Sequence, residues 1–276
     1  MLVVKVGGGQ SIAWDEVCAD LARRWRQEPV VLLHGASKEL DQISARLGQP
    51  PRHVRSASGI ESRFTDDATM EIFTMVYAGS ANVRVVARLL AHGVVALGLS
   101  GVDGAVLRGP EKGVLRTRDE DGRQRVVRGD RTGVVSEVNS SLLRLLLDSG
   151  YMPVLCPPAL SDQGRPMNVD GDRAAARVAC ALGADTLVLL SDVPGLLRDP
   201  DDEGSLVAEF RRHEIGRAME MARGRMRLKV LAAREALQGG VRRVVLADGR
   251  KARPVSRACR GEGTVFRRSG APRSRE

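Results

Sequence analysis

Short runs of apolar, mostly β-branched residues alternate along the chain with longer segments in which apolar positions recur every three or four residues. The short runs predict buried strands and the longer segments predict amphipathic helices. The expected strands cover residues 2–6, 30–33, 94–97, 152–156, 186–190, 243–246 and 264–266. The expected helices cover residues 12–27, 39–47, 65–77, 80–92, 141–148, 172–182 and 224–238. Strands that alternate with helices favour a mostly parallel sheet with helices on both faces, so we predict an α/β fold.

Proline, glycine and charge patterns add detail to this picture. We expect Pro157-Pro158 to end the strand that begins at Met152, because proline cannot donate a ladder hydrogen bond. Residues 53–63 have an extended or hairpin pattern. Residues 112–131 are polar and arginine-rich, with Asp121-Gly122 as the expected hairpin turn. The basic tail, residues 267–276, is expected to be disordered.

Composition narrows the class of protein. The chain has 276 residues, 43% hydrophobic content and only 3% aromatics, which suits one large domain or two lobes with a core of Val, Leu, Ala and Ile. No apolar run reaches the ~18 residues of a membrane span, and the N-terminus reads as a strand rather than a signal peptide. The four cysteines and four histidines are widely scattered. We therefore expect reduced thiols, a cytoplasmic location and no metal bound by the protein itself.

The formal net charge of +9 leaves two interpretations open. One is a solvated, arginine-rich surface, and the other is a surface for an acidic partner, either nucleic acid or an acidic protein. The scarcity of aromatics and the lack of a recognisable nucleic-acid motif argue against nucleic acid.

The candidate chemistry lies in three segments far apart in sequence, each beside a predicted strand–helix junction. They are Lys5-Val6-Gly7-Gly8-Gly9, Asn168-Val169-Asp170-Gly171-Asp172 and Gly224-Arg225-Met226-Arg227-Leu228-Lys229. Together they offer two ammonium groups, a carboxylate that can hold them and several backbone N–H donors. Phosphoryl transfer needs such a set, because the protein mainly positions and neutralises the transferred group. Taken alone, each segment has a structural explanation: a glycine turn, a helix N-cap and a surface lysine.

Two further segments fit the same chemistry. His34-Gly35-Ala36-Ser37 follows the second strand, and two glycine-type loops at adjacent strand ends can form one anion cradle. A simple strand-to-helix turn with Ser37 as N-cap explains this segment equally well. Arg63 precedes a predicted helix and could bind a carboxylate with its guanidinium fork. The chain lacks a GxxxxGK[ST] loop, so it is not a P-loop enzyme.

In this order and context, these motifs resemble the amino acid kinase family, in particular its acetylglutamate kinase branch. The resemblance runs from Lys5 to about Phe266. The segments that carry it are 168–175, 183–185, 190–196 and 98–104. Within the branch, three segments are most similar to the kinases that act on α-aminoadipate or glutamate tethered to an acidic amino-group carrier protein. These are His34-Gly35-Ala36-Ser37, Ser62-Arg63-Phe64-Thr65-Asp66 and the basic segment 123–131.

The resemblance implies a role for each matched residue. Lys5 and Lys229 would neutralise the transferred phosphoryl group, and Asp172 would hold both ammonium groups. Gly8 would offer its backbone N–H to the γ-phosphate. The implied substrate-binding residues are Gly35, Ala36, Ser37, Arg63 and Asn168. The implied nucleotide-binding residues are Gly7, Ser191, Asp192, Gly195 and Leu196.

The same resemblance implies a reaction and an architecture. A side-chain carboxylate would attack the γ-phosphate of ATP, with Mg²⁺ held mainly through the nucleotide phosphates, and give an acyl phosphate. The fold would be a three-layer α/β/α sandwich with a mainly parallel central sheet and two lobes. Residues 1–160 would bind the amino-acid substrate and form a homodimer, and residues 161–266 would bind ATP.

Two positions depart from the family pattern. Ala36 stands where glycine is usual, and a positive φ there would cost on the order of 1 kcal/mol. Asp41 stands where asparagine is expected. Either change could alter substrate preference or weaken activity.

The alternatives to a carrier-dependent kinase are a kinase of free N-acetylglutamate and a non-catalytic nucleotide- or carrier-binding relative. The positive net charge favours the carrier-dependent kinase, because a substrate presented by an acidic protein calls for basic residues around the entrance of the site. Six arginines in or beside the predicted hairpin form the expected carrier-binding arm: Arg116, Arg118, Arg123, Arg125, Arg128 and Arg131.

Overall fold

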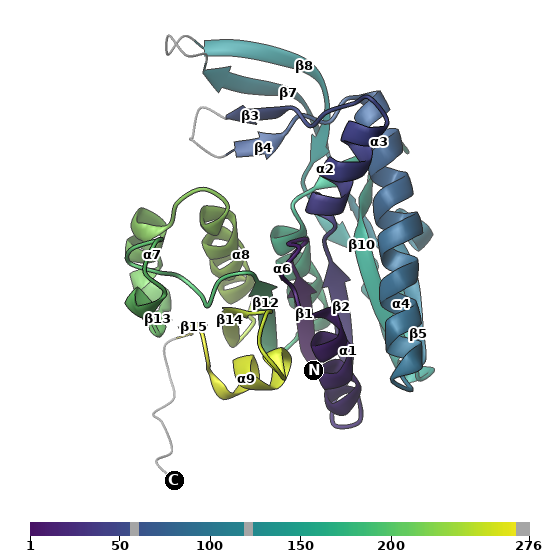
Figure 1. Ribbon diagram of the computed structural model, residues 1–276. Coiled ribbons are helices and arrows are strands. Elements are labelled where there is room, and N and C mark those ends of the chain that lie inside the picture. Colours follow the sequence, from purple (N-terminus) through teal and green to yellow (C-terminus); the bar gives the residue numbers. More distant parts are fainter. Residues whose placement is uncertain (56–60, 119–123, 269–276) are drawn as a thin grey trace.

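The computed structural model describes residues 1–55, 61–118 and 124–268, and a large, mostly parallel β-sheet forms its centre (Figure 1). The strands are β1 (Leu2–Val6), β2 (Val30–His34), β3 (His53–Arg55), β4 (Glu61–Arg63), β5 (Ala96–Gly101), β6 (Leu107–Gly109), β7 (Glu111–Arg118), β8 (Gln124–Gly133), β9 (Glu137–Val138), β10 (Met152–Ser161), β11 (Pro166–Val169), β12 (Thr186–Ser191), β13 (Glu209–Arg211), β14 (Arg243–Asp248) and β15 (Thr264–Arg267). The main strand order is β13-β15-β14-β12-β1-β2-β10-β11-β8-β7. The two halves of the chain thus share one sheet, joined where β12 pairs with β1.

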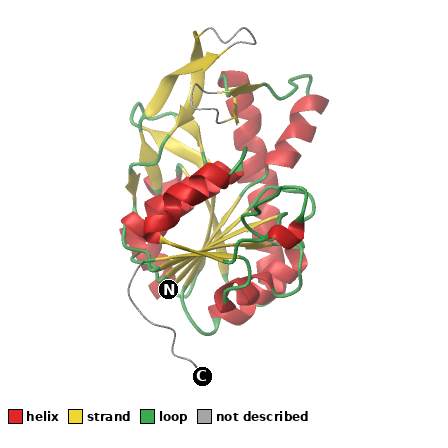
Figure 2. Cartoon of the chain, turned by 90° about the vertical axis from the view of Figure 1, so that its left-hand side faces the viewer, coloured by secondary structure: helices red, strands yellow, loops and turns green. Residues whose placement is uncertain are grey.

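Helices cover both faces of this sheet, as Figure 2 shows with the sheet seen nearly edge-on. The helices are α1 (Trp14–Trp25), α2 (Ser37–Arg46), α3 (Asp67–Thr74), α4 (Asn82–Ala91), α5 (Ser140–Asp148), α6 (Gly171–Leu182), α7 (Ile215–Met221), α8 (Met226–Gln238) and α9 (Pro254–Arg260). Core residues of α5, α6, α7 and α8 cluster on one face, and those of α1, α4 and α9 cluster on the other. The predicted α/β class with a mainly parallel sheet is confirmed.

The alternation of side chains along β1 shows how the layers form. Val3 packs in the cluster on the α6 and α8 face, whereas Leu2, Val4 and Val6 pack in the cluster on the α1 face. Successive side chains of a strand point to opposite faces. The side chain of Lys5 therefore lies on the same face as Val3, toward α6 and α8.

Two hairpins project from the upper part of the molecule in Figure 1. β3 pairs with β4, β7 pairs with β8, and β3 contacts β7. Both predicted hairpins are therefore present. The expected turn at Asp121-Gly122 lies outside the described residues, as does Arg123.

Three expectations about element boundaries are wrong. Pro157-Pro158 does not end a strand, because β10 continues to Ser161. The two prolines fall where β10 changes neighbours, after its pairing with β5 at Met152–Cys156 and before its pairing with β6 and β11, so no ladder hydrogen bond is lost. The helices predicted on either side of Gly79 are joined by a π-helical segment, Met75–Ala81. Arg267, which was expected to begin a disordered tail, instead ends β15, and residues 269–276 of that tail lie outside the described residues.

The expected boundary between lobes, at residue 160, falls inside β10. The division into lobes stays a prediction. Within the described part of the chain, no helix combines the length and the apolar character that crossing a membrane requires.

Candidate active site

Two ammonium groups share one carboxylate at the carboxyl end of β1. Lys5 Nζ lies 2.7 Å from Asp172 Oδ1, and Lys229 Nζ lies 3.0 Å from Asp172 Oδ2. Only 8% of Lys5, 6% of Asp172 and 8% of Lys229 is exposed. Each ammonium carries more than one N–H donor, and Asp172 is the only carboxylate within ion-pairing distance of either among the described residues. The remaining donors are free for an anionic ligand.

Burial and mutual attraction compete in this group. Burial would raise the pKa of Asp172, but the charges of Lys229 and Lys5 outweigh it and hold that pKa well below its usual range. Burial also opposes the charge of Lys5, yet the adjacent carboxylate raises the pKa of Lys5. Burial and repulsion from Lys5 lower the pKa of Lys229. Asp172 therefore stays ionised and fixes both lysines in place.

Local sequence explains how the three side chains meet. Asp170 caps α6, with its Oδ1 accepting the backbone N–H of Arg173 at 2.9 Å. This cap places Asp172 in the first turn of α6, where the helix dipole favours a negative charge. Lys229 lies near the start of α8, which packs on α6. Gly171 leaves room for the lysine stem, because a Cβ there would lie 3.3 Å from Cε of Lys5.

The two glycine loops interlock beside this group. A Cβ on Gly8 would lie 2.8 Å from the backbone nitrogen of Ala36 and closer still to that of Ser37. A Cβ on Gly35 would lie 3.0 Å from the nitrogen of Gly8. Lys38 donates its backbone N–H to the carbonyl of Gly8 at 3.2 Å. Glycine at these positions therefore lets two backbone segments from adjacent strand ends approach each other closely.

Ala36 fits this loop without backbone strain. Its φ is −144°, outside the left-handed region. The cost that a positive φ would impose does not arise. The side chain is buried with Leu40, Phe73 and Tyr77 in a small apolar cluster rather than lining the cleft.

Arg63 has one half of its guanidinium fixed and the other half free. Its Nη2 pairs with Oδ1 of Asp41. Its Nη1 is buried without a hydrogen-bond partner among the described residues. Asp41, the second departure from the family pattern, thus has an identifiable function, because it holds Arg63 at the cleft.

Asn168 belongs to a chain of hydrogen bonds that ties β11 and β8 to the start of α3. Its Nδ2 donates to Thr65 Oγ1 at 3.0 Å. The backbone N–H of Thr65 in turn donates to Oδ1 of Asp130 at 3.0 Å, and Thr132 donates its hydroxyl to the other oxygen of that carboxylate. Asp130 is fully buried and sequence reasoning did not single it out.

A cleft of about 630 Å³ brings most of the predicted site residues together. Those that line it are Lys5, Gly7, Gly8, Gly35, Ser37, Arg63, Asn168, Asp172, Ser191, Asp192 and Lys229. Gly195 and Leu196 do not line it. Leu196 is buried, and its backbone N–H donates to Thr264 Oγ1 at 2.8 Å, while a Cβ on Gly195 would lie 2.6 Å from that same oxygen. In this structure these two residues pack the loop after β12 against β15.

The cleft also contains residues that sequence reasoning did not assign. Phe73 and Tyr77 line it with stacked rings whose centroids are 4.1 Å apart. These two aromatic residues lie four positions apart in a chain with few aromatics, and this spacing in the sequence already indicated that their rings pack together. Nη1 of Arg225, from the α8 side, lies 3.5 Å from Oγ of Ser37 and so approaches the substrate-side loop. Arg225 belongs to the candidate segment 224–229, but its place opposite Ser37 follows only from this contact across the cleft.

The described residues include no group of three or more histidine, cysteine, aspartate or glutamate side chains arranged to hold a metal ion. The cleft does fit a polyphosphate, because two ammonium groups, the glycine loop after β1 and the N-terminus of α6 converge on it.

Comparison with known proteins gives a consistent result. Residues 1–248 match the model of the amino acid kinase family. The chain is 53% identical to a LysW-aminoadipate kinase of Deinococcus radiodurans over 266 residues, covering 96% of this chain and 91% of the relative. It is 48% identical to the LysW-aminoadipate kinase of Thermus thermophilus, covering 97% and 100%. An acetylglutamate kinase of Methanopyrus kandleri is 38% identical, covering 97% and 100%.

Solved structures agree on the fold. N-acetylglutamate synthase from Neisseria gonorrhoeae, bound to coenzyme A and N-acetyl-glutamate, superimposes with a TM-score of 0.78 at 26% identity. The match covers 98% of this chain and 60% of that longer protein. A Giardia carbamate kinase matches with a TM-score of 0.68 at 16% identity, over 97% of this chain and 98% of that one, which supports the fold alone.

Proposed function

The chain belongs to the amino acid kinase family, and we propose that it transfers the γ-phosphoryl group of ATP to a side-chain carboxylate. The acceptor is α-aminoadipate, or glutamate, attached to an acidic amino-group carrier protein. The product is an acyl phosphate used in lysine or arginine biosynthesis. The single observation that carries this proposal is the buried Lys5–Asp172–Lys229 group at the cleft.

The chemistry of that group suits phosphoryl transfer. ATP supplies the transferred group, and the substrate carboxylate is already ionised at neutral pH, so no protein nucleophile is required. Lys5 and Lys229 neutralise charge on the phosphoryl oxygens, and Asp172 keeps both in place without using all their donors. The Gly8 backbone contributes an N–H from a half-buried loop at the cleft, as a fixed dipole directed at the charge of the transferred group.

Substrate and nucleotide occupy different parts of the cleft in this proposal. Arg63, held by Asp41, binds the carboxylate at the α-carbon end of the substrate, and Gly35, Ser37 and Asn168 line the same side. Ser191, Asp192 and the loop that includes Gly195 and Leu196 lie on the nucleotide side, with Gly7. Mg²⁺ is held mainly through the nucleotide phosphates.

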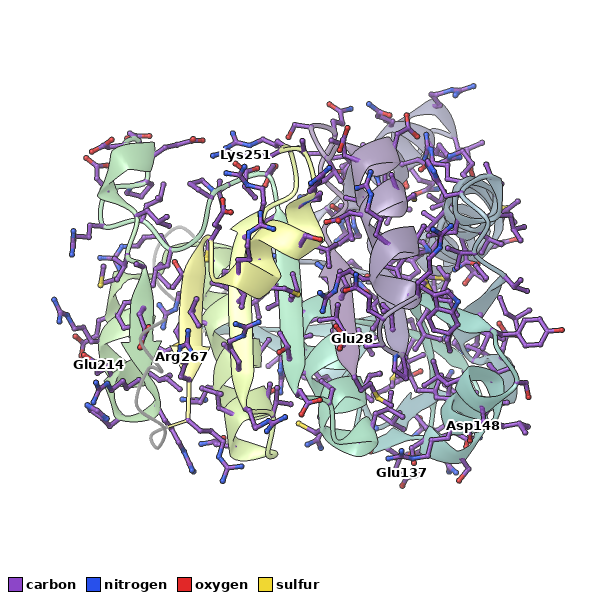
Figure 3. The ribbon with its side chains drawn as sticks, turned by 90° about the horizontal axis from the view of Figure 1, so that it is seen from below. Glu28, Glu137, Asp148, Glu214, Lys251 and Arg267 are labelled. Carbon is purple, nitrogen blue, oxygen red and sulfur yellow. The ribbon has the colours of Figure 1, made fainter. Side chains whose placement is uncertain are left out.

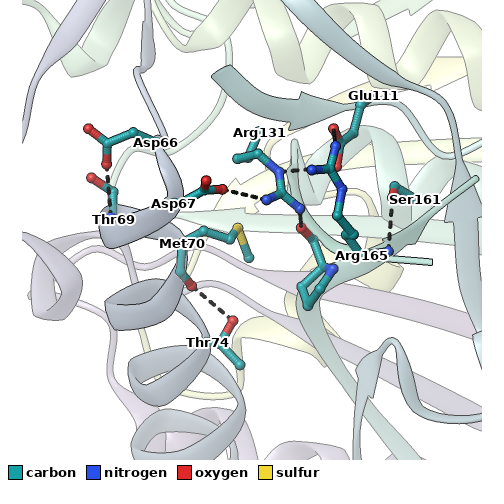
Figure 4. A network of polar contacts seen from close by, with 10 residues as sticks. Asp66, Asp67, Thr69, Met70, Thr74, Glu111, Arg131, Ser161 and Arg165 are labelled. Carbon is teal, nitrogen blue, oxygen red and sulfur yellow. Dashed lines mark hydrogen bonds and ion pairs between the residues drawn. The ribbon is translucent and has the colours of Figure 1, made fainter. Parts of the chain in front are cut away.

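A carrier protein as partner is supported by the names of the two relatives above and by exposed cations at the cleft and on β8. Lys112 lines the cleft and is exposed, and Arg128 is exposed on β8. Arg131 is not available, because it pairs with Asp67 and Glu111 and donates to the carbonyl of Pro166 (Figure 4). The side chains of Arg116, Arg118, Arg123 and Arg125 lie outside the described residues.

We also propose a homodimer through the α4 and β5 face. Val83 and Leu90 on α4, and Val95 beside β5, are 63%, 51% and 52% exposed. β5 pairs with β10 alone among the described strands, so its other edge is open. Val83→Glu combined with Leu90→Glu is expected to halve the mass measured by light scattering.

A cytoplasmic location fits the four free cysteines, Cys18, Cys156, Cys180 and Cys259.

The second candidate function is phosphorylation of free N-acetylglutamate, which the Methanopyrus kandleri relative favours. ATP consumption separates the two when it is measured with three substrates in parallel: carrier-bound α-aminoadipate, carrier-bound glutamate and free N-acetylglutamate. Turnover only with a tethered substrate supports the proposal. Turnover with free N-acetylglutamate alone replaces it with the second candidate, and no turnover with any of the three rejects both.

A further inference from the structure

A second cavity, of about 410 Å³, lies at the end of the central strands opposite to the cleft. The cleft is at the carboxyl ends of β1 and β12, whereas this cavity is lined by the residues at which β1, β12 and β14 begin. The end of α1 and the helix α9 complete its walls. Figure 3 views the molecule from below, where the strands run up the picture, and labels Glu28 and Arg267 on either side of several of them.

The lining of this cavity is strongly cationic. Arg24, Arg243 and Arg260 contribute to it, and Glu28 is its one acidic residue among the described lining residues. The charge of Glu28 is already compensated, because Arg24 pairs with it and the amino group of Met1 lies 3.4 Å from its Oε2. The cavity therefore keeps an excess of positive charge.

Arg243 is the least compensated of these arginines. Its Nη2 donates to the carbonyl of Cys259 at 2.8 Å, and it has no ion pair with a carboxylate among the described residues. In the antiparallel pairing of β14 with β15, Arg243 lies directly opposite Arg267. Like charges placed opposite each other on neighbouring strands destabilise a sheet. Burial, and repulsion from Arg267 and Arg24, lower the pKa of Arg243.

A purely structural role accounts for only part of this arrangement. Capping of α9 explains one N–H of Arg243, and Arg267 across the ladder pairs with Glu209, with Nε 3.5 Å from Oε2. Neither contact gives Arg243 itself a counter-charge. Nε of Arg24 is also buried without a hydrogen-bond partner among the described residues. We propose that this cavity is a binding site for a small, doubly charged oxyanion, carried by a phosphate group or by a dicarboxylate. The guanidinium forks would bind it through paired, charge-assisted hydrogen bonds.

This proposal is tested by direct binding rather than by activity, so it stands or fails independently of the proposed kinase reaction. Binding of inorganic phosphate and of succinate to the full chain is measured by titration calorimetry at constant ionic strength. Because the cleft also offers cations, each titration is repeated in a Lys229→Met background. Stronger binding of phosphate identifies a phosphate group as the ligand chemistry, and stronger binding of succinate identifies a dicarboxylate.

In that background we expect one anion to bind, and Arg243→Gln to weaken its binding by about tenfold or more. Glutamine can still donate to a carbonyl, and Arg260→Gln serves as an independent variant if Arg243→Gln does not fold. The matched control is Arg217→Gln, which removes the same charge from an exposed position on α7 and should leave affinity within about twofold. Equal affinities in the cavity variants and the control, or no binding of either anion, would overturn the proposal.

Discussion

Asp172 and Lys229, from the first turns of two packed helices, form a buried ion pair with Nζ 3.0 Å from Oδ2. The other oxygen of the same carboxylate lies 2.7 Å from Nζ of Lys5. One buried carboxylate therefore supports two cations that sequence separates widely. Asp172 positions the two lysines, and the lysines contact the ligand. We therefore expect substitutions of Asp172 and of Lys229 to differ in their effects on stability and on catalysis.

Asp172→Asn is expected to destabilise the fold as well as abolish activity. It leaves two buried ammonium groups without a counter-charge, a change that typically costs about 3–5 kcal/mol. Urea unfolding followed by circular dichroism measures the effect. Asp162→Asn, which alters an exposed ion pair with Arg108, is the control and should change stability by less than about 1 kcal/mol. Similar stability of the two variants would mean that Asp172 does not hold the lysines.

Lys229→Met is expected to lower kcat while the chain stays folded. The methionine fills a similar volume and leaves Asp172 paired with Lys5. Loss of one cation from the site should reduce kcat by about 10²–10³-fold, as for other preorganised electrostatic groups. Steady-state kinetics with saturating ATP measures this, and unchanged kcat would remove Lys229 from the catalytic group.

Gly8→Ala is expected to weaken nucleotide binding and activity, since its Cβ would overlap the backbone of the second glycine loop. The matched control is Gly216→Ala on α7, where an added Cβ meets nothing within 4 Å. Nucleotide affinity measured by fluorescence titration should fall only for the first variant. Equal affinities would show that the two loops have room to separate at no cost.

Asp41→Asn is expected to raise KM for the amino-acid substrate with little change in KM for ATP. Asparagine loses the charge that holds Nη2 of Arg63, so the free half of the guanidinium becomes less well positioned. Arg84→Gln, which removes a partly exposed partner of Glu39, is the control and should leave both constants unchanged. A parallel rise of both KM values in Asp41→Asn would indicate a general disturbance of the cleft instead.

His34 predicts a pH dependence of stability. It is buried, its Nε2 accepts from Nδ2 of Asn82 at 3.0 Å, and burial lowers its pKa from 6.5 to about 4. In the unfolded chain His34 binds a proton below pH ~6.5, whereas in the folded chain it stays neutral down to about pH 4. The free energy of unfolding therefore falls as the pH drops through this window. The full loss is about 3 kcal/mol.

His34→Gln should flatten that part of the stability profile. Urea unfolding of both proteins between pH 4 and pH 7 checks the prediction, with His53→Gln on β3 as the control for an exposed histidine. An equal acid slope in wild type and His34→Gln would assign the loss to other groups.

The sequence predicted those parts of the fold in which local pattern and burial agree. The strands at residues 2–6, 30–34 and 186–191 are apolar at most of their positions, and the helices that carry Asp172 and Lys229 begin close to where they were expected. Element boundaries that depend on strand pairing between distant segments were not predicted. Pro157 and Pro158 are accommodated within β10 where that strand changes neighbours, which no local pattern reveals.

The same distinction applies to the cleft. Composition and spacing left each candidate segment with a structural explanation, and only the family resemblance joined Lys5 to Lys229. The ion pair of Arg63 with Asp41, the buried Asp130 and the approach of Arg225 to Ser37 arise from contacts between distant segments. No local pattern in the sequence indicates these contacts. The stacking of Phe73 on Tyr77, in contrast, is indicated by their spacing of four residues.

Trapping of the product tests the central proposal most directly. The chain is incubated with ATP, Mg²⁺ and carrier-bound α-aminoadipate in the presence of hydroxylamine, and the carrier is then analysed by mass spectrometry. We predict a hydroxamate on the tethered side chain that requires ATP and is strongly reduced with Lys229→Met. An unmodified carrier, together with a hydroxamate formed from free N-acetylglutamate in a parallel incubation, would overturn the carrier-dependent reaction.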